Sequence, residues 1–302
     1  MATGITSSIC SRRLLANLAA ACLLIFLAGC AGGIPKDLEQ SLGIVTPQAI
    51  DFGELEYYAL RSKAAYAPEE EIRRQFPNTT VVKTVEPINV QYFLETDPAT
   101  KTQTISVRGT ANKLNIRQDV KVILVKDSFV GFLLHTGFRD DAQKVLADLK
   151  PHLQKDYAIR VTGHSLGGAI AMIMTVYIYR EGYKVERLVT FGQPKVTDDK
   201  SNYRYWQTNP DYKKITRVVR ENDPVPMVPA RPKYGHVGSE LILKEGQDYA
   251  FLDAYDADRL SIGNLWRRFG DVEIKDHSMD LYLTNIQGKI QNGAQQVAYS
   301  KL

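Results

Sequence analysis

The pattern of hydrophobic and polar positions predicts two helices and a β-hairpin near the start of the domain. Apolar and aromatic residues recur at helical spacing over 55–67, and a second short helical stretch covers 69–74. Two runs of alternating polarity follow, 88–96 and 101–109, and Asp97–Thr100 between them has the composition of a turn. We therefore expect helical segments first and a hairpin after them.

Beyond residue 119 the apolar runs alternate between strand and helix. A helix is predicted over 140–154, and a second over 167–182 that is apolar almost all round and should be buried. The predicted strands are 120–126, 130–137, 158–163, 185–192 and 215–222. Strands joined by helical crossovers indicate an α/β fold with a mostly parallel central sheet and helices on both faces. Ligand chemistry in such folds collects at the carboxyl ends of the strands.

The first thirty residues differ in composition from the rest of the chain. Arg12 and Arg13 precede an apolar run of about 15 residues, which is the pattern of a signal peptide. A transmembrane anchor is the alternative, although a helix that spans hydrocarbon needs about 20 apolar residues. We predict a signal peptide over 1–29, a tether over 30–50 and one domain over 51–302.

The end of the predicted signal peptide, Leu27-Ala-Gly-Cys30, resembles the bacterial lipobox. The resemblance implies cleavage before Cys30 and acylation of its thiol and amine, which gives durable attachment to a membrane. Ala31 is not acidic, which favours the outer membrane if the host has one. We therefore expect a membrane-anchored lipoprotein of the cell envelope.

Composition narrows the class of protein. Cys10, Cys22 and Cys30 are the only cysteines, so we expect no disulfide in the domain, whose stability must come from its core. The formal net charge is +4, or +2 without Arg12 and Arg13, and the basic residues are scattered among acidic ones, which argues against nucleic-acid binding. The sequence has no histidine pair at metal-ligand spacing and no glycine-rich phosphate loop, so we expect no metal or cofactor.

The stretch Val161–Ile170, VTGHSLGGAI, places a serine between two glycines where a predicted strand meets a predicted helix. So tight a turn needs small residues two before and two after its apex, and Gly163 and Gly167 stand there. The turn lifts the hydroxyl of Ser165 above the sheet edge, and the helix adds backbone N–H groups and a positive dipole end. A loop that only connects the two elements is the alternative. In this context Ser165 is predicted to be a nucleophile.

A serine nucleophile needs a base, and the base needs an acid that orients it. Asp223 follows the last predicted strand, two strands beyond the serine, so its carboxylate is expected at a carboxyl end of the sheet. An aspartate before proline is often only a turn residue. Asp198 and Asp199, in a more polar stretch, are the competitors.

The base is chosen among five histidines. His277 lies on a loop that enters a late predicted helix, with Asp276 and Ser278 as candidate caps. His236, which follows Asp223 closely in the sequence, is the main alternative. The others are His164 next to the serine, His135 at the end of a predicted strand and His152 at a polar helix end. We predict that His277 is the base.

A tetrahedral oxyanion needs hydrogen-bond donors. The backbone N–H of Leu166, directly after the serine, is the first, and the second is expected from a loop after an earlier strand. Thr110 lies at the end of the second predicted hairpin strand and is placed for this role. A threonine that merely closes the strand is the alternative.

These motifs together resemble the class 3, or fungal-type, lipases of the α/β-hydrolase superfamily. The stretches that carry the resemblance, in family order, are VRGTANKLNIRQDV, LLHTGF, VTGHSLGGAIA, VTFGQPKV, RENDPVPMVP, YGHVGSELI and DHSMDLYL. The resemblance implies a triad of Ser165, Asp223 and His277, an oxyanion hole at Thr110 and Leu166, and hydrolysis of carboxylic esters of acyl lipids. A phospholipase, thioesterase, acyltransferase or short-chain esterase shares this nucleophile, and a non-catalytic lipoprotein on the same fold is the alternative from another class.

The sequence also departs from the family pattern. Ile116, Lys195 and Thr197 replace a tryptophan, an arginine and a glycine, and Tyr282 lies two places later than the family's tyrosine. The lid that the resemblance places after Thr110, ANKLNIRQDV, carries little apolar surface. We therefore expect modest interfacial activation and tolerance of short or medium acyl chains.

Overall fold

The computed structural model describes residues 49–109, 123–198, 200–201, 214–229, 234–253 and 274–299. Residues 48–296 form one compact unit, and a second unit comprises 1–47 and 297–302. The predicted signal peptide, Cys30, most of the tether, Thr110, the lid stretch and Asp199 lie outside the described residues.

The chain enters the compact unit through two helices and an antiparallel ribbon. α3 (Phe52–Ala64) is capped at its N-terminus by Asp51, whose side chain accepts a hydrogen bond from the backbone N–H of Glu54, 3.0 Å away. The expected helices and hairpin are confirmed, whereas the first strand of the ribbon was not predicted. The ribbon and its second helix are α4 (Glu69–Gln75), β1 (Thr79–Val85), β2 (Val90–Asp97) and β3 (Thr102–Val107).

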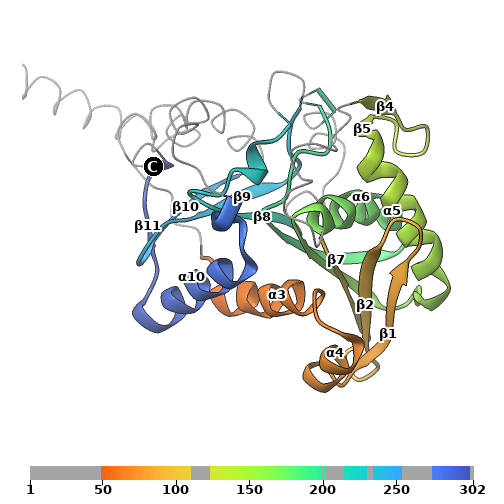
Figure 1. Cartoon of the computed structure of the whole chain (residues 1–302), viewed down its shortest axis with the longest axis horizontal. Helices are drawn as coiled ribbons and strands as arrows, with labels where there is room; N and C mark the ends of the chain where they lie inside the picture. Colours follow the sequence, from red (N-terminus) through yellow and green to blue (C-terminus); the bar gives the residue numbers. More distant parts are fainter. Residues whose placement is uncertain are drawn as a thin grey trace, which may run out of the picture. The chain divides into compact units, whose positions relative to one another are not determined.

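The central sheet has nine strands in the order β1-β2-β3-β6-β7-β8-β9-β10-β11 (Figure 1). Its middle, from β3 to β9, is parallel, while β1, β2 and β10 run antiparallel to their neighbours towards the middle of the sheet. The remaining strands are β6 (Ala158–His164), β7 (Lys184–Phe191), β8 (Ile215–Arg220), β9 (Ser239–Leu243), β10 (Asp248–Leu252) and β11 (Gln295–Gln296). The mostly parallel sheet is therefore confirmed, although the last three strands were not predicted.

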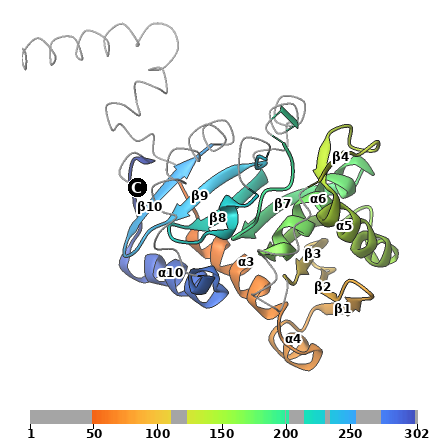
Figure 2. The same cartoon turned by 45° about the horizontal axis from the view of Figure 1, so that its top comes forward.

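Helices cover both faces of this sheet (Figure 2). α5 (Thr136–Leu149) and α6 (Leu166–Arg180) pack on one face, and α3 and α10 (Met279–Asn292) on the other. Along β7, Leu188 joins the first apolar cluster and Val189 the second, because successive side chains of a strand point to opposite faces. The buried, nearly all-apolar α6 fits the expectation from its sequence.

One part of the prediction was wrong. Segments 120–126 and 130–137 were expected as strands of the alternating pattern, but β4 (Leu124–Lys126) and β5 (Leu133–His135) pair with each other in a two-stranded antiparallel sheet separate from the main one. Helix α5 also begins earlier than predicted, at 136, because the side chain of His135 caps it by accepting from the Phe138 N–H.

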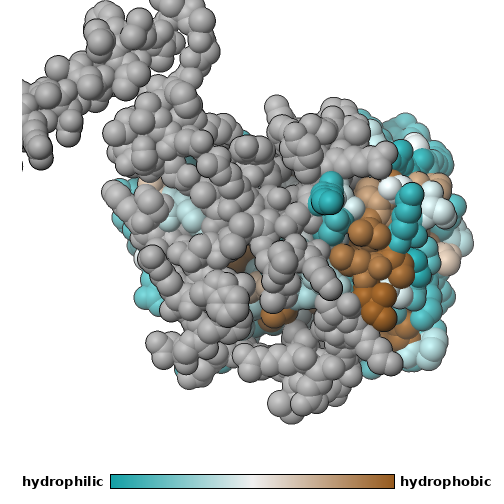
Figure 3. Space-filling view, turned by 90° about the horizontal axis from the view of Figure 1, so that it is seen from above, coloured by the Kyte–Doolittle hydropathy of each residue, from teal (hydrophilic) through white to brown (hydrophobic). Residues whose placement is uncertain are grey.

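The β4–β5 hairpin presents apolar side chains to solvent. Ile123 and Phe129 are 55% and 52% exposed, and the view from above shows brown apolar atoms gathered on this side of the described surface (Figure 3). These two residues lie just before β4 and in the turn, whereas the apolar residues of the two strands themselves are half-buried or buried.

Candidate active site

Ser165 occupies a strained turn between β6 and α6. Its backbone has φ 59° and ψ −131°, a conformation that residues with a side chain seldom adopt and that is retained chiefly at functional positions. A Cβ on Gly163 would lie 2.5 Å from the carbonyl oxygen of Gly167, and a Cβ on Gly167 would collide with the backbone of β3. The two glycines are therefore required by the turn, as the sequence indicated.

The helix that follows the serine directs its N-terminus at the turn. Leu166 is the first residue of α6, and the N–H groups of Gly168 and Ala169 donate to the carbonyl oxygen of Ser165. Thr110 lies outside the described residues, but Gly109 just before it packs so tightly that a Cβ there would lie 3.0 Å from Ser165 Cβ. The end of β3 thus reaches the serine from the side on which the second oxyanion donor was predicted.

Asp223 and His277 form a buried hydrogen-bonded pair. His277 Nδ1 lies 2.8 Å from Asp223 Oδ2, and the two side chains are 3% and 0% exposed. The other carboxylate oxygen, Oδ1, accepts from the backbone N–H of Val225 at 2.9 Å. A carboxylate at this distance makes Nδ1 the donor, so Nε2 of His277 is left as the proton acceptor in the neutral ring.

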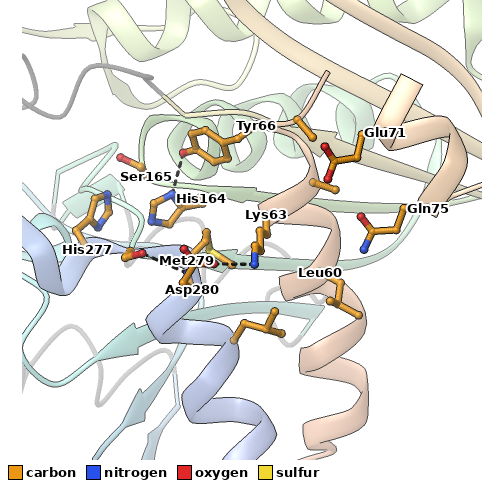
Figure 4. A pocket seen from close by; sticks show the side chains of 14 residues that line it. Leu60, Lys63, Tyr66, Glu71, Gln75, His164, Ser165, His277, Met279 and Asp280 are labelled. Carbon is orange, nitrogen blue, oxygen red and sulfur yellow. Dashed lines mark hydrogen bonds and ion pairs between the residues drawn. The ribbon is translucent and has the colours of Figure 1, made fainter. Parts of the chain in front are cut away.

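The serine and the imidazole line the same pocket, which has a volume of about 570 Å³ (Figure 4). Ser165 Oγ and His277 Nε2 are both buried, and neither has a hydrogen-bond partner in the described part of the chain. Buried polar atoms of this kind are normally satisfied. Two unsatisfied polar atoms in one pocket indicate a site in which both act on a bound molecule.

A glycine that was not singled out in the sequence makes the pair possible. Gly192, directly after β7, has φ +56°, and a Cβ there would lie 2.7 Å from both Asp223 Oδ2 and His277 Cε1. Any side chain would therefore displace the carboxylate or the ring. Its only signal in the sequence was its place in VTFGQPKV.

The competing candidates have other partners. His236 Nε2 lies 2.7 Å from the carbonyl oxygen of Pro226, and His135 caps α5, where burial lowers the pKa of its imidazole. Asp198 accepts from the backbone N–H of Ser201. His152 ends the short 3₁₀ helix Lys150–His152. Among the described candidates, the structure brings only His277 onto Asp223.

Two tyrosines complete the site, and the sequence had assigned neither a role. The hydroxyl of Tyr282 donates to Asp223 Oδ2 at 2.6 Å and accepts from the backbone N–H of Arg220 at 3.1 Å. Burial, and then the charge of Asp223, raise the pKa of Tyr282 well above its usual value. The Tyr66 hydroxyl lies 2.8 Å from His164 Nδ1, and the His164 ring stacks on His277 with centroids 4.3 Å apart.

Helix α10 explains how Tyr282 reaches the aspartate. Ser278 caps this helix through its side chain, as the sequence suggested, and Asp276 instead accepts from Arg220. Tyr282 therefore lies in the first turn of α10, five residues beyond His277. The tyrosine of the family pattern, shifted here by two places, was the signal that could have found it.

In the part of the chain that the structure describes, no group of three or more His, Cys, Asp or Glu side chains could hold a metal ion. No helix within the described ranges is long and apolar enough to cross a bilayer.

Residues 104–233 match the sequence profile of the lipase (class 3) family, and this segment contains the strained serine and Asp223. The profile match is thus confined to 130 of the 302 residues and does not include His277. Among curated proteins, this chain is 32% identical over 163 residues to "secreted mono- and diacylglycerol lipase 1" of Fusarium solani, a match that covers 51% of this chain and 47% of that protein. It is 33% identical over 129 residues to "lipase A" of Sodiomyces alcalophilus, covering 37% of this chain and 31% of that protein. The matches therefore span about half the length, or less, of these relatives.

Solved structures show the same fold. The Lip2 lipase of Yarrowia lipolytica superposes with a TM-score of 0.63 at 24% identity, over 77% of this chain and 95% of that one. A lipase from Rhizopus microsporus var. chinensis gives a TM-score of 0.62 at 26% identity, over 77% and 88% of the two chains. The protein therefore has the α/β-hydrolase fold that the sequence predicted.

Proposed function

We propose that this protein is a serine carboxylic ester hydrolase that acts on acyl lipids. The observation that carries the proposal is the buried His277–Asp223 pair, whose unpaired Nε2 faces the same pocket as the unpaired Oγ of Ser165. The strained backbone of Ser165 supports catalysis over a non-catalytic role, because a residue that only connects two elements has no need of such strain.

The proposed reaction proceeds through an acyl-enzyme. Ser165 Oγ attacks the ester carbonyl carbon while His277 Nε2 takes the hydroxyl proton, and Asp223 stabilises the resulting imidazolium. The backbone N–H of Leu166 and the predicted donor Thr110 stabilise the oxyanion. Collapse breaks the bond to the alcohol, which receives the proton from His277. Water, deprotonated in turn by His277, then releases the fatty acid and restores the serine.

The substrate class is inferred from relatives. The Fusarium protein is named a mono- and diacylglycerol lipase, and one structural neighbour is described as a triacylglycerol lipase whose catalytic centre is a serine protease triad. We infer that the substrates here are likewise acyl esters of a polyol, with water as the acyl acceptor. Thioesterase and acyltransferase activities use the same nucleophile, and no feature of the described site favours them.

The test is an ester panel that varies acyl length and alcohol, with three forms of the protein. Wild type should hydrolyse short chromogenic and glycerol esters, and Ser165→Ala should lose several decades of kcat/KM. Ser106→Ala is the matched control, because Ser106 is also buried without a hydrogen-bond partner but lies in β3 outside the pocket. Equal activity in Ser165→Ala, or a serine-directed phosphonate bound to another residue, would refute the assignment.

We also propose that the protein is anchored to a membrane of the cell envelope through lipid on Cys30. The support is the sequence Leu27-Ala-Gly-Cys30 after an apolar run and an arginine pair. Mass spectrometry of the mature protein should find a diacylated or triacylated Cys30, and Cys30→Ser should remain unprocessed. A free N-terminus beyond residue 30 would instead show ordinary secretion.

A further inference from the structure

The pocket beside Ser165 is built by three helices. Leu60, Ala64, Met279 and Leu283 are buried or half-buried and provide its apolar lining, from one side of α3 and the start of α10. Its volume of about 570 Å³ falls within the usual range for small-molecule sites, about 300–1,000 Å³. The pocket is therefore large enough for a substantial part of a lipid besides the reacting ester.

Three charged side chains lie in the exposed part of the lining, which an acyl chain does not require. Lys63 of α3, Glu71 and Gln75 of α4, and Asp280 of α10 all line the pocket and are exposed. Figure 4 shows Ser165 and His277 towards one end and Glu71 and Gln75 towards the other, with Lys63 and Asp280 between them. One cation and two anions thus lie beyond the reacting groups.

Lys63 and Asp280 are joined by an ion pair that a ligand can open at little cost. Their Nζ and Oδ1 atoms are 2.7 Å apart, and the side chains are 50% and 70% exposed. Exposed pairs of this kind contribute only about 0–1 kcal/mol. A ligand that carries one positive and one negative charge can therefore break this ion pair and form two new ones, at little cost in free energy.

The start of α10 adds to the attraction for an anion. Ser278, Met279 and Asp280 lie at the N-terminus of this 14-residue helix and line the pocket. Its dipole favours negative charge there. The cation of Lys63 and the positive end of α10 thus face the same space, and Asp280 and Glu71 remain to bind a positive group.

We propose that this pocket binds the headgroup of a zwitterionic glycerophospholipid, with Lys63 on the phosphate and Asp280 on the ammonium group. In such lipids a glycerol carbon chain joins the phosphate to the acyl ester, so headgroup and ester reach one pocket together. The inference rests on the proposed ester hydrolysis and adds that the alcohol released is a phosphodiester of glycerol.

The test compares soluble substrates with one short acyl chain: a lysophosphatidylcholine, a lysophosphatidylglycerol and a monoacylglycerol, with fatty acid release as the readout. Lys63→Met should lower kcat/KM for the two phospholipids relative to the monoacylglycerol by about fivefold, the size of one exposed charge pair. Asp280→Asn should lower the ratio of kcat/KM for the lysophosphatidylcholine to kcat/KM for the lysophosphatidylglycerol by a similar factor. Both effects should shrink in high salt.

Lys101→Met is the matched control, because Lys101 pairs with Asp156 at 3.2 Å with 65% and 63% exposure but lies away from the pocket. Its substrate ratios should equal those of wild type. Unchanged ratios in Lys63→Met, or a wild type that hydrolyses the monoacylglycerol but neither phospholipid, would overturn the headgroup site and leave ester hydrolysis standing. A wild type that hydrolyses none of the three would overturn both.

Discussion

Replacing Tyr282 by phenylalanine tests whether the tyrosine hydroxyl holds Asp223 in position for His277. The change removes the hydroxyl that donates to Asp223 Oδ2 at 2.6 Å and that accepts from the Arg220 N–H at 3.1 Å. The ring stays, with its edge-to-face contact to Phe191 at 5.9 Å. The substitution thus deletes two hydrogen bonds and little apolar area.

The expected size of the effect follows from the charge of the acceptor. A hydrogen bond to a charged group contributes about 1.5–3 kcal/mol, and Tyr282 and Asp223 are both fully buried. At roughly 2–4 °C per kcal/mol for a domain of 150–250 residues, Tm should fall by about 5 °C. If about 1.4 kcal/mol of the loss appears in the transition state, where the imidazolium needs an oriented carboxylate, kcat falls about tenfold.

The control is Tyr177→Phe. The Tyr177 hydroxyl donates to Asp127 Oδ2 at 2.6 Å and accepts from Gln143 at 3.2 Å, and the bond to Asp127 is also buried. It joins α6 to the β4–β5 hairpin rather than to the site. Turnover of a soluble chromogenic ester and thermal unfolding should show both variants destabilised and only Tyr282→Phe slowed. Equal kcat in the two variants would refute the positioning role.

Three further predictions follow from the backbone and from one buried lysine. Ser165→Gly and Ser165→Ala should both be inactive, but the glycine variant should be the more stable by about 1 kcal/mol in urea unfolding because φ 59° suits glycine; the reverse order would argue against strain. Gly163→Ala should lower the free energy of unfolding by about 3 kcal/mol or more, since its Cβ would lie 2.5 Å from a carbonyl oxygen. Gly288→Ala in α10, whose Cβ would have no atom within 4 Å, should instead raise it by about 1 kcal/mol. Similar values for the two variants would contradict the packing. Burial lowers the pKa of Lys289 from 10.5 to about 8, so the unfolded chain binds more protons between these values and this group's contribution to stability rises with pH across that window. The stability difference between wild type and Lys289→Met should therefore increase from pH 8 to 10.5, and a flat difference would show that the lysine titrates normally.

The chemistry of the site was predictable where it is local in the sequence. Gly163, Ser165 and Gly167 belong to one turn, and its steric demands can be derived from residue types alone. Asp223 and His277 were chosen from their places after a strand and before a helix, and the structure brings them within 2.8 Å. Their catalytic roles stay predictions until the variants are measured.

What the sequence did not show depends on contacts between distant segments. Gly192 must be glycine because Asp223 and His277 converge on it, and the role of Tyr282 depends on the carboxylate 59 positions earlier. Neither feature leaves a periodic pattern.

The missed strands have a related cause. β1 is mostly half-exposed, with polar and apolar residues mixed, while β9 is a short run buried throughout. Neither gives the alternation that marks a strand with one solvated face. The β4–β5 hairpin shows the opposite error, because strand-like apolar runs there remain outside the main sheet.

The packing of α10 against α3 joins the last helix of the compact unit to its first. His277 and Tyr282 follow strands β1 to β10 and the serine turn in the sequence, so they are synthesised after them. A ribosome-bound or truncated chain that ends before residue 277 therefore holds the strained serine without its base. Under the proposed mechanism, ester hydrolysis can therefore begin only when synthesis of the domain is nearly finished.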